Sequence, residues 1–320
     1  MLKNNLLCFC LPTCDKEDMF TYLLPSLKNI GELKNYASFS ITFQPPYTEE
    51  DIEIVIKEFK KLNLNYKYEF KKYEFEEGQT PLVQMRNDCA LRYPKALFYA
   101  LLDDDMQFLP GIDRDYLNLL NCMLGDRNLS VAIMLEPILN NPEFAKRFNM
   151  GVEYADFENS NYFTGNGIIY RGGYYYGFDG LLPEDMLKYV GGRQDILMAV
   201  WRILQGDSSI KGGNCQCLHY EHRDVTGYSK YKWLTSLNPS VPTCTSWLES
   251  VGFIAPILSI FGRQDTFYRN FSQQKCEELY KKGCRSTQTN NGNAKIQTYL
   301  IEVDELLPQI NEKLNNIDNQ

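Results

Sequence analysis

The stretch that decides the fold is Ala96-Leu-Phe-Tyr-Ala-Leu-Leu-Asp-Asp-Asp105. Its first seven residues are apolar or aromatic without interruption, which is typical of a strand buried on both faces of a parallel sheet. The run ends abruptly in three aspartates, and open α/β sheets bind their ligands at the carboxyl ends of their strands. We therefore expect Asp103, Asp104 and Asp105 to lie in a ligand site at that edge of the sheet.

Three adjacent carboxylates at the end of a buried strand are costly on their own. Like charges raise each other's pKa, and burying an unpaired carboxylate is unfavourable. A divalent cation relieves both penalties, so the triplet predicts a metal site. In an extended chain Asp103 and Asp105 point the same way, which allows one to address a ribose hydroxyl or the metal and the other the metal. The alternative is a solvated acidic loop that caps the next segment.

Strand and helix signals alternate over the residues from 5 to 135, which predicts an α/β fold with a mostly parallel central sheet flanked by helices. The expected strands are 5–11, 37–43, 66–75, 96–102 and 130–135, then 168–170 and 215–220, and the expected helices are 15–30, 48–62, 81–93 and 195–204. Residues 226–320 differ. There we expect a mainly helical C-terminal region, with helices at 233–261, 273–282 and 300–314 and a loop at 290–293. The predicted division is thus a domain over 1–225 and a helical region over 226–320.

The overall composition excludes several classes of protein. The chain has 320 residues, of which 44% are hydrophobic and 23% charged, as in ordinary globular proteins. Its net charge of -8 argues against a nucleic-acid partner, which would require a basic surface. An apolar run of membrane-spanning length is missing, and Pro12 interrupts the opening apolar stretch, which favours a buried first strand over a signal peptide. We expect a cytoplasmic protein, with peripheral membrane contact through residues 247–261 as an alternative that Pro256 weakens.

The ten cysteines do not form a disulfide framework of the kind found in short secreted domains, so we expect free, mostly buried thiols. Cys215, Cys217, His219 and His222 supply four potential zinc ligands within eight residues. Cys215, Cys217 and His219 would lie along one face of a strand, about 6–7 Å apart and too far for one ion, so a zinc site is disfavoured.

Five segments together resemble one known family. Residues 96–105, followed by Pro110-Gly111, resemble the DxD strand of GT-A glycosyltransferases, especially those of the family 2 type. Four further segments are similar to that family's motifs in the same order, and they are Leu6 to Thr13, Met85-Arg86-Asn87, Thr164 to Arg171 and Gly192 to Val200. The match covers residues 5–225. It departs from the family at Gln194-Asp195, where the family usually has Glu-Asp.

The resemblance implies a GT-A, Rossmann-like fold. It also implies an inverting, metal-dependent transfer of a sugar from a UDP- or GDP-linked donor to an acceptor hydroxyl. Thr13, Asp15 and Arg86 would bind the donor together with the three aspartates. Asp15 fits equally well as the N-cap of a helix. Arg86 fits equally well as a surface arginine on an amphipathic helix.

The same resemblance assigns the chemistry. Mn²⁺ or Mg²⁺ would be held by Asp103 and Asp105 with His219 or His222, the only two histidines of the chain. The metal would stabilise the leaving diphosphate, and Asp195 would be the general base that activates the acceptor. The alternative for Asp195 is a capping residue at a helix N-terminus.

The acceptor would contact Gly165 and Asn166 on one strand, and the aromatic residues Tyr176 and Trp233, although aromatic residues are more often part of a core. Two other functions stay open. A nucleotidyltransferase would be expected to carry a glycine-rich loop after the first strand, and residues 11–15 contain no glycine. A catalytically silent sugar-binding protein is kept open by the missing acid before Asp195.

Overall fold

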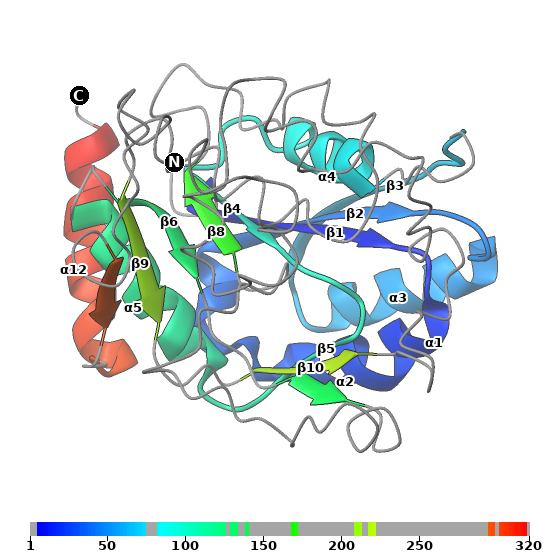
Figure 1. The fold of residues 1–320 in the computed structure, drawn as a ribbon, viewed down its shortest axis with the longest axis horizontal. Coiled ribbons are helices and arrows are strands. Elements are labelled where there is room, and N and C mark those ends of the chain that lie inside the picture. The colour runs from blue at the N-terminus through cyan, green and yellow to red at the C-terminus, as the bar shows by residue number, and fades with distance from the viewer. Residues whose placement is uncertain are drawn as a thin grey trace, which may run out of the picture.

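The computed structural model describes residues 5–74, 82–125, 129–133, 138–140, 168–171, 208–212, 217–221, 294–297 and 301–318. The described strands are β1 (Leu7–Thr13), β2 (Ala37–Phe43), β3 (Asn65–Phe70), β4 (Phe98–Leu101), β5 (Met106–Phe108), β6 (Leu129–Ile133), β7 (Ile138–Asn140), β8 (Ile168–Arg171), β9 (Ser208–Gly212), β10 (Cys217–Glu221) and β11 (Ala294–Gln297). They form an eight-stranded sheet in the order β11-β9-β6-β8-β4-β1-β2-β3 and a three-stranded sheet in the order β5-β10-β7 (Figure 1).

The main sheet is mixed and mostly parallel, as the sequence predicted. Strands β3, β2, β1 and β4 are parallel to one another, and so are β6, β9 and β11. Strand β8 is antiparallel to both β4 and β6. Because β1, β2 and β4 are parallel, their carboxyl ends lie at the same edge of the sheet.

Helices cover both faces of the sheet, and the alternation of side chains along each strand decides which face contacts which helix. Phe9 of β1 packs edge-on against Tyr116 of helix α5 (Ile112–Gly125), with ring centroids 5.1 Å apart. Phe39 of β2 packs in the same way on Phe59 of α3 (Glu49–Lys61), also at 5.1 Å. On the opposite face Thr42 contacts α4 (Leu82–Leu91), where its hydroxyl lies 3.2 Å from the sulfur of Cys89.

The bounds predicted from the sequence agree closely with the structure for several of these elements. Strand β2 has the predicted bounds, and α3 begins after Thr48, whose side chain forms a capping box with Asp51. Strand β3 ends at Phe70 rather than residue 75. The amide of Lys71 still donates to the carbonyl of Phe43, the last residue of β2, and beyond that point β2 offers no partner.

The single helix predicted over 15–30 is wrong. The segment instead forms α1 (Lys16–Asp18), the π-helical η2 (Met19–Leu23), α2 (Leu24–Ser26) and the 3₁₀-helical η3 (Leu27–Asn35). Two residues interrupt a regular helix here. Pro25 lacks the amide hydrogen that an α-helix interior uses, and Gly31 has φ +51° and ψ -133°, outside the helical region.

Helix α5 and the short strands β5, β7, β9 and β11 were not predicted. Helix α5 is buried almost throughout, including the polar residues Asn118 and Asn121. These asparagines hold the C-terminal helix α12 (Val303–Asp318) and the residues before it. Asn118 bonds both the carbonyl (2.8 Å) and the amide (2.9 Å) of Ile301, and the ammonium of Lys313 donates to the carbonyl of Asn121 (2.9 Å).

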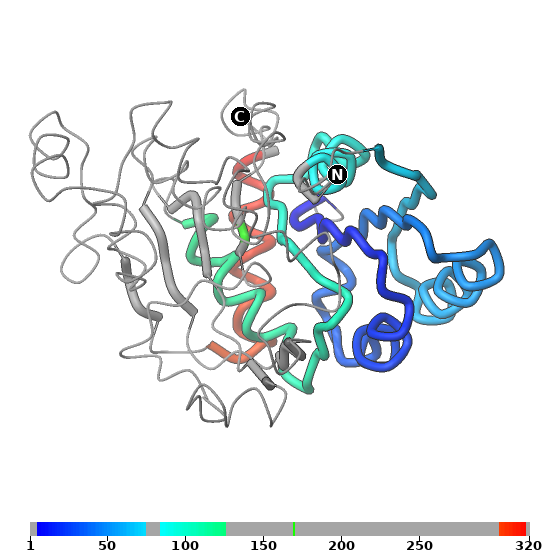
Figure 2. The backbone as a smooth tube through the Cα atoms, turned by 45° about the vertical axis from the view of Figure 1, so that its right-hand side comes forward, coloured from blue at the N-terminus to red at the C-terminus, as the bar shows by residue number. Residues whose placement is uncertain are grey.

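Helix α12 therefore lies against α5 on the outside of the sheet, as Figure 2 shows (red beside green). It confirms the predicted C-terminal helix, with bounds shifted from 300–314. Strand β11 adds to the main sheet beside β9. The helices predicted at 195–204, 233–261 and 273–282, and the loop at 290–293, lie outside the described residues. The boundary at residue 225 stays a prediction.

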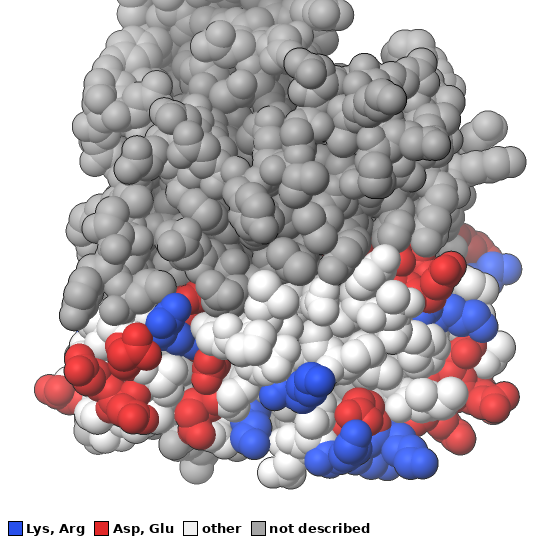
Figure 3. All heavy atoms as spheres, turned by 90° about the horizontal axis from the view of Figure 1, so that it is seen from below, with Lys and Arg blue, Asp and Glu red and all other residues white. Residues whose placement is uncertain are grey.

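Two further features concern the surface. Acidic and basic side chains are interspersed over the described part of the face seen from below (Figure 3). In the described part of the chain, helices with the length and apolarity needed to cross a membrane are missing.

The turn at Gly31 yields a prediction about stability. A Cβ at this position would lie 2.0 Å from Oδ2 of Asp113, in a backbone conformation that L side chains rarely adopt. We expect Gly31→Ala to lower the free energy of unfolding by roughly 1–3 kcal/mol, measured by urea denaturation. The matched control is Gly125→Ala, where the nearest described atoms to the new Cβ are Nζ (3.2 Å) and Cε (3.7 Å) of Lys313 and the backbone has no positive φ. Equal stability of Gly31→Ala and the wild type would contradict the prediction.

Candidate functional site

The candidate site lies where β1 and β4 end at the carboxyl edge of the sheet. Strand β4 stops at Leu101, and the three aspartates follow before β5 begins at Met106. Asp104 and Asp105 lie in a turn rather than in an extended strand. The extended conformation on which the expectation for Asp103 and Asp105 rested is therefore absent, and the alternation of strand side chains does not apply to them.

Asp104 ties the two strand ends together. Its Oδ2 accepts a hydrogen bond from the hydroxyl of Thr13 (2.6 Å) and another from the backbone amide of Asp15 (3.2 Å). Thr13 is 1% exposed and closes β1, so its hydroxyl is held in place by the sheet. The first consequence of the acidic triplet is therefore structural, since its middle member joins β4 to β1.

A tyrosine that the sequence analysis missed completes this network. The hydroxyl of Tyr47 lies 2.8 Å from the hydroxyl of Thr13 and donates to the backbone carbonyl of Asp15 at 3.2 Å. The position of Tyr47 in the sequence could have predicted this contact, because Tyr47 follows the end of β2, which is parallel to β1. Residues just beyond parallel neighbours of a candidate strand gather at the same edge.

The side chain of Asp15 caps α1, as one of its two predicted roles required. Its Oδ1 accepts from the amides of Glu17 (2.9 Å) and Asp18 (3.2 Å). Asp15 is 7% exposed, so most of its surface is already in contact with the protein.

Arg86 is buried, and the alternative of a surface arginine is wrong. It is 3% exposed, and its Nη2 lies 3.5 Å from Oδ1 of Asp103, which is 31% exposed. Among the described residues, its Nε has no hydrogen-bond partner. Helix α4 thus places a buried guanidinium beside the acidic turn, and the Nε–H group of that guanidinium can still donate a hydrogen bond.

The acidic turn is electrostatically strained. Desolvation raises the pKa of Asp104 well above its usual value, the charge of Asp105 and then that of Asp103 raise it further, and the bond from Thr13 opposes the shift. Desolvation and the nearby charge of Asp104 also raise the pKa of Tyr47. A positive charge placed at this turn would relieve the repulsion.

The residues around the turn fit a hard divalent cation in part. Carboxylate oxygens suit Mg²⁺ and Mn²⁺, which also keep waters and bind phosphate oxygens. Among the described residues, however, groups of three His, Cys, Asp or Glu side chains placed to hold a metal are absent. Strand β10 runs antiparallel to β5 with His219 opposite Met106, the residue after Asp105. The backbone therefore brings the predicted histidine ligand to the acidic turn.

Several predicted site residues lie outside the described residues, and their roles stay predictions. They are Asp195, His222, Gly165, Asn166, Tyr176 and Trp233. For His219 the structure places the backbone alone.

Comparisons with known proteins identify the fold. Searches of protein-family models and of curated proteins return no match to this sequence. Among solved structures, GalNAc-T7 with UDP, GalNAc and Mn²⁺ has a TM-score of 0.53 at 12% identity, over 86% of this chain and 54% of that one. This chain has the GT-A fold.

Two other GT-A structures are similar at lower scores. Residues 1–349 of TarS from S. aureus, in complex with UDP, give a TM-score of 0.47 at 17% identity, over 67% of this chain and 60% of that one. The mannosyltransferase PcManGT from Pyrobaculum calidifontis, with GDP-Man and Mn²⁺, gives 0.47 at 12% identity, over 99% and 76%. This chain thus spans about 60% of the TarS fragment and about half of GalNAc-T7.

The strain at the acidic turn of this GT-A sheet yields a second prediction. Asp104→Asn removes a disfavoured charge but keeps an oxygen that can accept from Thr13 and Asp15. We expect it to raise the free energy of unfolding in buffer with EDTA, measured by urea denaturation, because burial and the neighbouring carboxylates disfavour the charged form of Asp104. Asp104→Ala loses the same charge and also the hydrogen bonds, so it should be less stable than Asp104→Asn by roughly 1–3 kcal/mol. Destabilisation by Asp104→Asn would mean that the network requires the charged form.

Proposed function

We propose that this protein is a metal-dependent, inverting glycosyltransferase that moves a sugar from a UDP- or GDP-linked donor to an acceptor hydroxyl. One observation carries the proposal. At the carboxyl edge of a GT-A sheet, the turn of Asp103 to Asp105 is fixed to β1 through Thr13 and faces the buried Arg86. This is the edge at which open α/β sheets bind ligands.

The donor half of the site binds a nucleotide diphosphate. Arg86 contributes a guanidinium whose planar donors match phosphate oxygens. Asp103 and Asp105, with His219 or His222, would hold Mn²⁺ or Mg²⁺. When bound, that cation stabilises the charge that develops on the leaving diphosphate. GalNAc-T7, seen with UDP and Mn²⁺, supports this choice of donor and metal.

The acceptor half rests on residues known from the sequence alone. Asp195 takes the proton of the acceptor hydroxyl as general base. Gly165, Asn166, Tyr176 and Trp233 line the acceptor side. We further propose that the protein works in the cytoplasm, where its thiols stay reduced. The five cysteines whose side chains the structure describes, Cys8, Cys10, Cys14, Cys89 and Cys122, are free.

A binding experiment tests the donor half. We expect titration calorimetry with UDP or GDP in the presence of Mn²⁺ to show binding that EDTA abolishes. Asp105→Ala should weaken this metal-dependent binding at least about tenfold, because it removes a charged ligand. The control is Asp304→Ala, an exposed acid in the first turn of α12. If neither nucleotide binds in the presence of Mn²⁺, the proposed donor site is wrong.

Product analysis separates the three candidate functions. With radiolabelled nucleotide sugars, a glycosyltransferase releases nucleoside diphosphate. A nucleotidyltransferase with pyrophosphate makes nucleoside triphosphate, and a silent sugar-binding protein releases neither.

The proposed base has its own test. Asp195→Asn should bind donor as the wild type does and lose transfer by about 10²–10⁴-fold, because the amide cannot accept the proton. The measurement is nucleoside diphosphate release at saturating donor. Full activity would remove Asp195 from the role of base and leave the donor site intact.

A further inference from the structure

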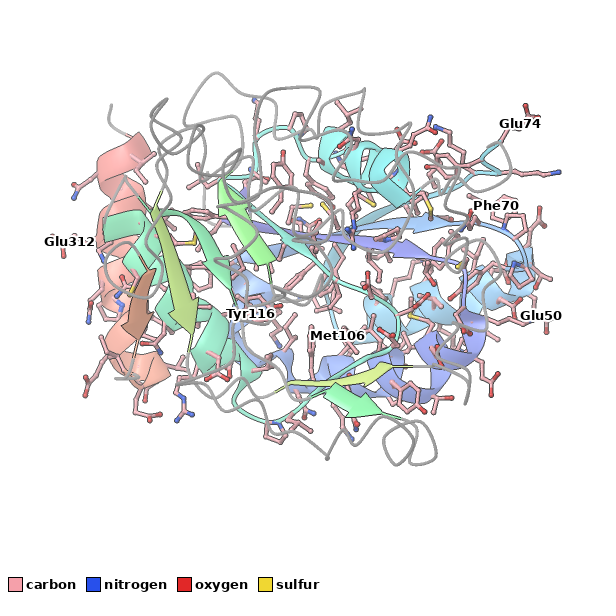
Figure 4. The ribbon with its side chains drawn as sticks, in the orientation of Figure 1. Glu50, Phe70, Glu74, Met106, Tyr116 and Glu312 are labelled. Carbon is pink, nitrogen blue, oxygen red and sulfur yellow. The ribbon has the colours of Figure 1, made fainter. Side chains whose placement is uncertain are left out.

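The outer edge of the main sheet is an aromatic strand that is open to solvent. Strand β3 ends the strand order, and β2 is its partner on the inner side. Tyr68 is 48% exposed and Phe70 is 51% exposed, and Figure 4 shows Phe70 at this end of the molecule. An exposed edge strand with large apolar side chains is a template for pairing with another strand.

The backbone of β3 divides its residues between the two edges. The amide of Lys71 donates to the carbonyl of Phe43 in β2, so Lys71 faces inward. Successive residues of a strand turn their polar backbone groups to opposite edges. Lys67 and Glu69 therefore also face β2, and Tyr66, Tyr68 and Phe70 turn their amides and carbonyls outward.

We propose that a second copy of this chain pairs with the outer edge of β3 in antiparallel fashion, forming a two-fold dimer centred on Tyr68. In this register Tyr68 opposes its own copy, and Tyr66 opposes Phe70 of the second copy. Each of these pairs joins residues whose backbone groups face outward. Each of these three residue pairs exchanges two backbone hydrogen bonds, so the strand pair forms about six.

Charge complementarity favours a second copy as the occupant, and it favours this register over those centred on residue 67 or 69. Centring on Tyr68 places Lys67 opposite Glu69 of the other copy, twice per dimer. These are non-hydrogen-bonded pairs, in which the side chains approach more closely. Centring the pair on residue 67 would place two lysines opposite each other, and centring it on residue 69 would place two glutamates opposite each other.

The side chains of β3 are already held in the positions that the dimer needs. The rings of Tyr66 and Tyr68 are stacked, with centroids 6.4 Å apart, and Tyr66 packs on Phe59 of α3. On the other face Arg92 bonds Glu69 at 3.0 Å, and Lys67 donates to the carbonyl of Arg92 at 2.7 Å. Pairing therefore orders few additional groups, which lowers the entropy cost of association.

The two-fold axis also fixes how the candidate sites lie in the dimer. Because the two copies of β3 are antiparallel, the carboxyl edges of the two main sheets face opposite directions. Each copy therefore keeps its acidic turn away from the junction, and the dimer is independent of the proposed glycosyl transfer.

Charge reversal tests the register. We expect analytical ultracentrifugation to show a reversible dimer whose share rises over a hundredfold range of protein concentration. Lys67→Glu creates two glutamate pairs and Glu69→Lys two lysine pairs, and each should weaken dimerisation about tenfold or more. The double variant Lys67→Glu/Glu69→Lys restores opposite charges and should dimerise within about threefold of the wild type. Lys34→Glu, a charge reversal of the same size at an exposed position outside β3, is the control.

Amide exchange of the wild type gives a second readout that needs no variant. The outward amides of Tyr66, Tyr68 and Phe70 should exchange fast at low concentration and become protected as concentration rises. The inward amides of Lys67 and Glu69 should be protected throughout. A wild type that stays monomeric, outward amides that never become protected, or a double variant that folds but does not recover dimerisation would each overturn the proposal.

Discussion

The site depends on one interaction, the pair of hydrogen bonds that Asp104 accepts from the hydroxyl of Thr13 and the amide of Asp15. These groups are about ninety residues apart along the chain, and the parallel pairing of β1 with β4 brings their strand ends together. Because Asp104 is held there, Asp103 and Asp105 are presented on either side of a fixed point. The middle aspartate thus fixes the position of the turn that carries the other two.

The hydrogen bonds to Asp104 also oppose an unfavourable electrostatic contribution at the site. Desolvation and two neighbouring carboxylates disfavour the charge on Asp104, and Thr13 and Asp15 offset part of that cost. The buried Arg86 approaches Asp103 alone, at 3.5 Å. The guanidinium offsets part of the charge on Asp103, whereas burial and the neighbouring carboxylates still disfavour the charge on Asp104.

Local signals carried most of the successful prediction. Strand β2 and the start of α3 were located from alternation and a capping box, both of which act over a few residues. The acidic turn was placed at the carboxyl edge from the buried strand before it, and Arg86 was placed beside it only through the resemblance to GT-A glycosyltransferases. Helix α5 was not predicted because Asn118 and Asn121 interrupt its apolar pattern. These two asparagines can be buried because they bond Ile301 and Lys313, which follow some 190 residues later in the sequence. Tyr47 was missed for a similar reason, because its partners belong to another strand.

The carboxyl edge of the main sheet and its outer strand β3 differ in how their polar groups are hydrogen-bonded. At the carboxyl edge, the ends of different strands come together, and a buried polar group such as the Asp104 carboxylate is hydrogen-bonded by groups from a distant segment. At the outer edge, β3 has a row of backbone groups that no described strand pairs with. Lysines on an edge strand normally protect it from other strands by repulsion. In β3 that protection is selective, because Glu69 lies two residues from Lys67 and pairing about Tyr68 places each lysine opposite a glutamate. A strand with lysine at both positions would place two lysines opposite each other in that same register, and this one does not.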